Sequence, residues 1–398
     1  MCGSQGAWSV GEREFMHSET FERAAIDLSN WRDLPWSRWS FQNVSEFVPS
    51  ALIASARRKE TPTRALGSFA EIAVEGETGE TLPLPRFLEE SHSNALVVMR
   101  GGDIIAEWYA DHCDPARPHI IFSISKSVTG LLAGILESRG MLSFSDPVVT
   151  YIPDAEGSAY GDLSLQDLFN MTVAVDFEEL YLDQTSDYDR YRRAMLWKPE
   201  RPDDPTPTLR ELVCSLPRAK HPHGGHHAYR SPNADMAGLV VEAAAGERYA
   251  DFLSKEIWKP MGAFTDAFIT VDRAGNPRSS GGISMTARDL ARLGELVRIG
   301  GGAIIPASFI EQLWAGGDRG VWASGEQGLL FPGGSYRNYW YETGTGALAG
   351  LGIHGQSLWI DRQSETVIVR QSSEPAPVND DLDQLVIAML KAISAHIP

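Results

Sequence analysis

Apolar residues recur at helical spacing in one segment of the first third of the chain. They stand three and four positions apart, which places them on one face of a helix: Val128, Leu131, Leu132 and Ile135. Gly140 follows at a position where glycine commonly ends a helix. The pattern predicts a helix that begins near residue 123 and ends before Gly140, with one face buried.

Short runs of strand-forming residues occur toward both ends of the sequence. Residues 95–99 and 104–109 are two such runs, and the segment 100–103 between them contains adjacent glycines, which predicts a hairpin. Four further strands are predicted in the last quarter of the chain, at residues 336–342, 346–353, 357–360 and 366–370.

The middle of the chain has the pattern of short helices joined by loops rich in proline and aspartate. Helices are predicted at residues 165–171, 208–216, 234–245 and 286–299, and an amphipathic helix near the C-terminus contains Leu382, Leu385, Val386, Met389 and Leu390. Ahead of the third helix, Ser231 stands at the cap position and Pro232 at the first helical position. We therefore expect an α+β fold, in which distant segments build one antiparallel sheet flanked by helices, with an all-helical region inserted.

This pattern divides the chain into four parts. Residues 1–30 are polar and weakly patterned, and we expect them to form an extended N-terminal arm. Residues 31–144 and 281–398 are expected to form the two parts of one α/β domain, with a helical region at residues 145–280 between them. The tryptophan-rich segment 30–41 is too aromatic for a free tail, so we expect it to pack against the body.

The composition is that of a soluble globular protein, with 43% apolar and 22% charged residues among 398. A net charge of −18 argues against nucleic acid or an anionic membrane as partner, since both require a basic surface. The three cysteines have no spacing that suits a disulfide framework or a metal site. No export signal and no run of about twenty apolar residues is visible, so we expect a cytoplasmic location.

Ser123 and Lys126 stand three residues apart at the start of the first predicted helix, so both side chains share one face. A lysine placed in this way can accept the proton of a serine nucleophile, and the free N–H groups of a helix start favour an oxyanion. The alternative is a helix cap beside a solvated lysine. The apolar residues 120–122 favour a buried amine with a lowered pKa instead. Ser125 is a rival nucleophile, but no lysine follows it at the same spacing.

Tyr229 lies just ahead of a well-marked helix, on a loop that can face a cleft. Neighbouring cations lower the pKa of a phenol, so Tyr229 can pass a proton to a leaving group. The alternative is a half-buried packing tyrosine.

Glycines interrupt one of the predicted strands near the C-terminus. Gly350, Gly352 and Gly355 weaken the strand, and such glycines mark a bulge or the close approach of a backbone or a ligand. A strand edge of this kind can bind an extended substrate and offer an N–H group to an oxyanion. His354 lies in the same segment. It is either a residue that orients or binds substrate, or a packing residue.

Two clusters of potential metal ligands have unsuitable spacing. Four histidines match no usual zinc pattern: His221, His223, His226 and His227. Six acidic residues lack the periodic spacing of a calcium loop and predict a solvated loop: Asp176, Glu178, Glu179, Asp183, Asp187 and Asp189. Tyr181, within that loop, can reach a pocket. We expect no metal and no cofactor.

These motifs occur in one order: Ser-x-x-Lys, then Tyr-x-Ser, then a glycine-rich strand. That order resembles the serine β-lactamase/penicillin-binding superfamily, and most closely its 6-aminohexanoate-dimer hydrolase (nylon oligomer hydrolase) and class C-like carboxylesterase group. The matching stretches extend from about residue 30 to the C-terminus, and they include FSISKSVTGLLAGIL, YRSPNADMAGLVVEAAAG and GIHGQSLWIDRQSETVIVRQSS. The resemblance implies the β-lactamase/DD-peptidase-like fold.

The resemblance also implies a role for each matching residue. Ser123 would be the acylated nucleophile, Lys126 its general base, and Tyr229 the group that assists proton transfer at the leaving group. Two backbone N–H groups, those of Ser123 and Ile353, would form the oxyanion hole. Tyr181, Ser231 and His354 are the expected substrate-binding residues.

The expected function is a serine hydrolase that cleaves small amides or esters through an acyl-enzyme, without a cofactor. Its partner is a small-molecule substrate, and a homodimer is possible. Alternatives are a β-lactamase or DD-peptidase-like enzyme, or a catalytically silent binding protein of the same fold. The Lys-Thr-Gly triplet of β-lactamases is absent, and Gly350-Leu351-Gly352 stands in its place. Without that cation to hold a β-lactam carboxylate, the sequence favours an amidase or esterase.

Overall fold

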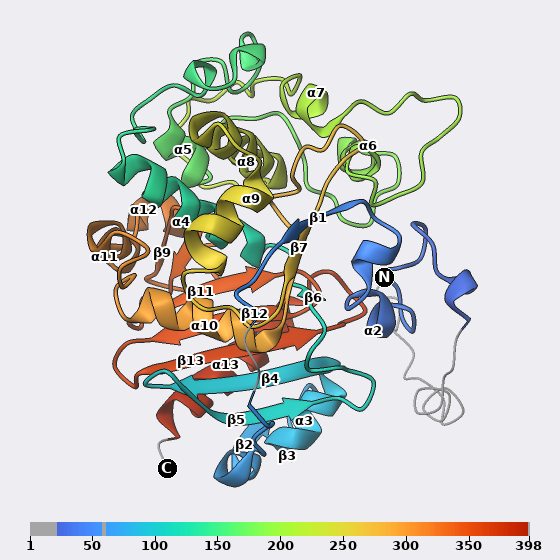
Figure 1. Cartoon of the computed structure of the whole chain (residues 1–398), viewed down its shortest axis with the longest axis vertical. Coiled ribbons are helices and arrows are strands. Elements are labelled where there is room, and N and C mark those ends of the chain that lie inside the picture. Colours follow the sequence, from blue (N-terminus) through green and yellow to red (C-terminus); the bar gives the residue numbers. More distant parts are fainter. Residues whose placement is uncertain (1–21, 58–60, 397–398) are drawn as a thin grey trace.

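A seven-stranded antiparallel sheet joins segments from the two ends of the chain (Figure 1). The computed structural model describes residues 22–57 and 61–396. The strand order is β5-β4-β13-β12-β11-β10-β9. The bounds are β4 Ser93–Arg100, β5 Asp103–Tyr109, β9 Ser335–Arg337, β10 Trp340–Glu342, β11 Ala347–Gly352, β12 Gln356–Asp361 and β13 Thr366–Ser372. The sequence-based expectation of one sheet built from distant segments is confirmed.

Helices cover both faces of this sheet. Helix α10 (Ala287–Arg298) packs on one face, where a Cβ on Gly294 would lie 2.5 Å from the Val367 side chain. Helix α13 (Asp380–Ala395) lies behind the sheet in Figure 1, and its Ser394 hydroxyl is 3.3 Å from the Thr366 hydroxyl. Because successive residues of a strand point to opposite faces, β13 contributes to the core on both sides.

A smaller sheet lies beside the start of the first predicted helix. It has the order β1-β7-β8-β6, with β1 Ser50–Ile53, β6 His119–Ile120, β7 Ala267–Thr270 and β8 Ile283–Met285. The hydrogen bond from Ile121 N to Ile283 O (2.9 Å) continues the β6–β8 pairing. This pairing brings the residues before Ser123 next to the residues after Ser280. A third, two-stranded sheet consists of β2 (Ala73–Glu75) and β3 (Thr81–Pro83).

A helical region lies on one side of the main sheet and occupies the upper part of Figure 1. Its helices are α5 Leu165–Phe169, α6 Asp187–Ala194, α7 Leu209–Val213, α8 Ser231–Ala245 and α9 Tyr249–Leu253. Between this region and the sheet runs α4 (Ile124–Ser138), which packs against α8 and against β11. The other α-helices among the described residues are α2 Ser37–Ser40, α3 Leu84–Glu90, α11 Ala307–Ala315 and α12 Arg319–Ala323.

The structure corrects several details of the sequence analysis. Residues 145–280 are not all helical, because β7 lies among them. The predicted strand 336–342 is a hairpin of β9 and β10, turned by Asn338 and Tyr339 with φ of 50° and 66°. Helix α8 begins at Ser231 itself, and Arg230 is its N-cap.

Near the N-terminus, the expectation for residues 1–30 falls mostly on positions 1–21, which lie outside the described residues. Trp31 and Phe41 are buried, so the packing expected of the tryptophan-rich segment is confirmed. Among the described residues, no helix is both long enough and apolar enough to cross a membrane.

Helix α4 is enclosed on all sides, and this determines which substitutions it tolerates. All its residues from Ile124 to Leu136 are buried. A Cβ on Gly130 would collide with the carbonyl oxygen of Asn338, which belongs to the β9–β10 turn. We expect Gly130→Ala to lower the free energy of unfolding by about 1–3 kcal/mol, as overpacking usually does. Urea denaturation measures this change.

Gly225→Ala is the matched control, because a Cβ there would meet no atom within 4 Å. An unchanged unfolding free energy for Gly130→Ala would contradict the close approach of the β9–β10 turn to α4.

Candidate active site

Ser123 is the N-cap of α4 and lies at the base of a cleft of about 450 Å³. The preceding residue, Phe122, has a φ of 43°, which is uncommon for a residue with a side chain and turns the chain sharply into the helix. Residues 120–122 are buried, as the apolar run in the sequence indicated. The local fold therefore presents the Ser123 hydroxyl to the cleft at a helix N-terminus.

Lys126 is 1% exposed and lies among three oxygen atoms. Its Nζ is 2.9 Å from Ser123 Oγ, 3.2 Å from Ser231 Oγ and 2.7 Å from the carbonyl oxygen of Ser280. Burial lowers the pKa of the Lys126 amine to about 7, as the sequence analysis expected. A neutral amine has two N–H groups and one lone pair. The Ser280 carbonyl can only accept a hydrogen bond, and Ser231 Oγ donates its proton to Glu179, so these two oxygens accept the N–H groups and the lone pair is available to the Ser123 hydroxyl.

Glu179 is a member of the site that the sequence analysis missed. Its carboxylate accepts hydrogen bonds from Ser231 N (2.5 Å), Ser231 Oγ (2.7 Å) and the Tyr181 hydroxyl (2.8 Å). It also lines a small cavity of about 10 Å³ beside Ser123. The prediction that the acidic loop is merely solvated is therefore wrong at Glu179, and also at Asp189, which is 1% exposed. The spacing of the acidic residues carried no signal for this contact.

Tyr229 is 9% exposed, and Lys126 Nζ lies 4.8 Å from the centre of its ring. Burial raises the pKa of the Tyr229 phenol well above its ordinary value, and a side-chain interaction with Ser123 acts weakly in the opposite direction. The expectation that cations lower this pKa is wrong, because burial raises it and the charges that act on it, those of Tyr341, Glu179 and Tyr188, raise it as well. Tyr229 is therefore a protonated phenol, which can donate a hydrogen bond or a proton.

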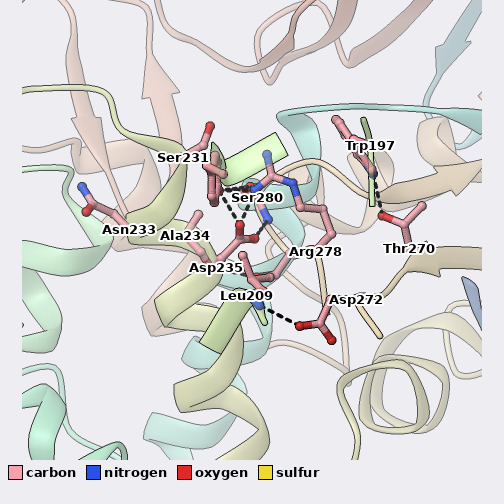
Figure 2. A network of polar contacts seen from close by, with 12 residues as sticks. Trp197, Leu209, Ser231, Asn233, Ala234, Asp235, Thr270, Asp272, Arg278 and Ser280 are labelled. Atoms are coloured by element: carbon pink, nitrogen blue, oxygen red, sulfur yellow. Dashed lines mark hydrogen bonds and ion pairs between the residues drawn. The ribbon is translucent and has the colours of Figure 1, made fainter. Parts of the chain in front are cut away.

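A buried ion pair fixes the segment whose Ser280 carbonyl accepts a hydrogen bond from Lys126. Figure 2 shows this pair, Asp235 and Arg278, beside Ser280. Asp235 accepts a hydrogen bond from Ser280 N (2.8 Å) and forms an ion pair with Arg278. The Arg278 guanidinium also contacts the hydroxyl groups of Tyr191 and Ser280. Asp235 and Arg278 are both nearly inaccessible to solvent, and no local sequence pattern indicates their pairing.

The end of β11 lies beside the start of α4. Only Leu348 and Ala349 of this strand pair with β10. The second half of β11 therefore has a free edge on the side of β10, although β11 is internal to the sheet. A Cβ on Gly352 would lie 3.1 Å from Ser123 N, so the close backbone approach predicted for these glycines is confirmed. Within the described residues, neither Ser123 N nor Ile353 N donates a hydrogen bond. Both N–H groups are therefore available to a carbonyl oxygen in the cleft.

Tyr181 and His354 occupy different environments. Tyr181 lines the cleft together with Ser123, Tyr229 and Ile353. His354 does not line it: its side chain is 3% exposed and packs against Phe41 and Phe122. The structure thus does not bring His354 into reach of a substrate in the cleft.

The outer part of the cleft combines apolar and acidic side chains. Leu329, Leu330, Leu351 and Val378 provide apolar surface, and Leu329 is 90% exposed. Four carboxylates also line this part: Glu326, Asp380, Asp381 and Asp383. Burial, together with the charge of Glu374, raises the pKa of Asp383 to about 7. The sequence analysis did not connect the start of the C-terminal helix with the site.

The four clustered histidines lie outside the cleft. His223 Nδ1 accepts a hydrogen bond from Ala174 N (2.9 Å), and His227 packs against Trp322 and Tyr336. In residues 22–57 and 61–396, no group of three or more histidine, cysteine, aspartate or glutamate side chains is placed to hold a metal ion.

Comparison with known proteins finds similar sequences and structures over most of the chain. The profile of the Beta-lactamase family matches residues 88–390. A 6-aminohexanoate-dimer hydrolase from Paenarthrobacter ureafaciens is 35% identical over 358 residues, which are 88% of each chain. A Bacillus anthracis structure with the provisional name 6-aminohexanoate-dimer hydrolase superposes with a TM-score of 0.85 at 25% identity, covering 95% of this chain and 98% of that one.

More distant relatives share the fold. EstCE1, a hydrolase with promiscuous acyltransferase activity, superposes with a TM-score of 0.60 at 16% identity, covering 78% of this chain and 96% of its own.

Proposed function

The chain belongs to the Beta-lactamase family, and we propose that it hydrolyses the amide or ester bond of a small substrate through an acyl-enzyme on Ser123. The chain is a serine hydrolase with the β-lactamase/DD-peptidase-like fold. One observation carries the assignment of the nucleophile: the Lys126 amine, buried and with a pKa near 7, lies 2.9 Å from Ser123 Oγ.

In the proposed acylation step, the substrate carbonyl oxygen accepts hydrogen bonds from the N–H groups of Ser123 and Ile353. Ser123 Oγ bonds to the carbonyl carbon while its proton moves to the lone pair of Lys126. The two N–H groups stabilise the negative charge that develops on the oxygen.

Collapse of the tetrahedral intermediate breaks the bond to the leaving group. The departing nitrogen or oxygen takes a proton from the Tyr229 hydroxyl, and the proton held by Lys126 restores the phenol. Water then attacks the acyl-enzyme and gives a proton to Lys126, which passes it to Ser123 Oγ as that oxygen departs, and the acid product leaves. Ser231 and Glu179 hold Lys126 in place through both steps.

The side chains that line the cleft favour a small, linear substrate with an apolar chain. Tyr181 lines the cleft together with Ser123, and apolar and acidic side chains line the outer part. A 6-aminohexanoate dimer, the compound that names the relatives, has such a chain and a terminal amine that the acidic residues would attract. The segment Gly350–Gly352 offers no cation for a β-lactam carboxylate, which supports an amidase or esterase over a β-lactamase.

Replacement of the nucleophile tests the proposal directly. We expect Ser123→Ala to abolish turnover of p-nitrophenyl butyrate and labelling by a fluorophosphonate probe, because the other hydroxyl group in contact with Lys126, that of Ser231, donates its proton to Glu179. Ser125→Ala is the matched control: Ser125 is buried and its hydroxyl accepts a hydrogen bond from Ile283 N, so the variant loses some stability but keeps its labelling. Labelling retained in Ser123→Ala would refute the assignment.

The role of Tyr229 can be separated from its packing by the choice of leaving group. We expect Tyr229→Phe to lower kcat for 6-aminohexanoate dimer by about 10²–10⁴, the range for loss of a general acid. Hydrolysis of the p-nitrophenyl ester should fall much less, because p-nitrophenolate leaves without a proton. Steady-state kinetics on both substrates measure the ratio of the loss of kcat on the amide to the loss on the ester.

Tyr336→Phe is the control, since Tyr336 is buried close to the Tyr229 ring but does not line the cleft. Equal losses on the amide and the ester in Tyr229→Phe would argue against proton donation by the phenol.

A further inference from the structure

Two residues with left-handed backbone conformations flank the two N–H groups that face the cleft. Phe122, with φ 43°, directly precedes Ser123, and His354, with φ 58°, directly follows Ile353. This conformation is uncommon for residues other than glycine, and it persists only where the surroundings enforce it. Each N–H group therefore belongs to a sharp turn that the local sequence alone does not favour.

The side chains of these two residues contact each other behind the site. The His354 ring centre lies 5.4 Å from that of Phe122, and Phe41 contacts both rings at 5.3 Å and 5.0 Å. All three side chains are at most 3% exposed. We call Phe41, Phe122 and His354 the aromatic clamp.

His354 makes four hydrogen bonds, the longest of which runs from Glu374 N to the His354 carbonyl oxygen (3.3 Å). Its Nδ1 is 2.7 Å from the carbonyl oxygen of Glu374, and its backbone N donates to Pro377 O at 3.0 Å. Its carbonyl oxygen accepts a hydrogen bond from Gln356 Nε2 at 2.9 Å. Because a carbonyl only accepts, Nδ1 carries a proton. Burial lowers the pKa of His354 to about 3, so the ring is neutral.

We propose that His354 is a positioning residue that sets the distance between the two oxyanion donors. The His354 ring holds the turn after Ile353 against Phe122. Phe122 directly precedes Ser123 and fixes its position. The inference rests on the proposed function, since it takes Ser123 N and Ile353 N as the groups that bind the oxyanion. It adds to that function a residue that touches no substrate.

Replacement of the ring at constant backbone conformation tests the clamp. Asparagine adopts positive φ more readily than most residues, so His354→Asn removes the aromatic contact with little backbone strain. We expect kcat for p-nitrophenyl butyrate to fall by about 10²-fold, the effect of misplacing a catalytic group by about 1 Å. KM should change by less than about threefold, because the oxyanion donors act mainly in the transition state.

A tetrahedral adduct gives a second, independent measurement. Phenylboronic acid bonded to Ser123 places an oxygen between the two donors, so we expect its affinity to fall together with kcat in His354→Asn. A residue with a purely structural role would lower the melting temperature and leave this affinity unchanged.

His119→Asn is the matched control. His119 is also fully buried, its ring also contacts Phe41 (5.7 Å), and its Nδ1 also bonds a backbone carbonyl (2.8 Å). It flanks neither donor, so its replacement should lower stability without changing kcat. Should His354→Asn fail to fold, Phe41→Leu weakens the clamp from its third side and should lower kcat at constant KM.

Unchanged kcat and boronate affinity in a folded His354→Asn or Phe41→Leu protein would overturn the inference, as would a rise in KM alone. Neither result would affect the assignment of Ser123. Failure of the proposed function would instead appear as probe labelling or turnover that survives in Ser123→Ala.

Discussion

The burial of the Lys126 amine is the constraint on which the rest of the site depends. An ammonium group removed from water is strongly disfavoured, so the amine gives up its proton near neutral pH, where an exposed lysine keeps it. That loss of charge supplies the lone pair that faces Ser123. The Ser280 carbonyl and the Ser231 hydroxyl occupy the other directions at 2.7 and 3.2 Å, so the amine is oriented as well as neutral.

The fold satisfies this constraint by joining three distant segments. Helix α4 carries Ser123 and Lys126, its neighbour α8 carries Ser231 at its start, and the pairing of β6 with β8 brings Ser280 alongside. The Asp235–Arg278 ion pair then fixes the segment around Ser280 (Figure 2). A buried ion pair contributes little net stability, but loss of one partner leaves a buried charge that costs about 3–5 kcal/mol. Its main effect here is to fix the position of the Ser280 carbonyl oxygen.

Local pattern was enough to predict α4, the β4–β5 hairpin and the Ser123–Lys126 pair, because helical spacing and a glycine turn are properties of adjacent residues. The free edge of β11 beside Ser123 was also foreseeable, since Gly350 and Gly352 have no side chains to prevent a close approach. No local pattern indicated Glu179, Asp235 or Arg278, because each of them acts through a partner that is far away in the sequence. The same holds for His354, whose environment is set by Phe41 and Phe122 and not by its own strand.

A direct titration of Lys126 tests the central claim of this account. In protein labelled with ¹⁵N and ¹³C at lysine, and with the Lys126 signal assigned by its absence in Lys126→Met, NMR follows the Nζ and Cε shifts against pH. We expect a midpoint near pH 7, with the neutral base accumulating as the pH rises through that value. A midpoint near about 10.4, the ordinary value for lysine, would mean that the amine stays charged at neutral pH and would contradict its role as the base.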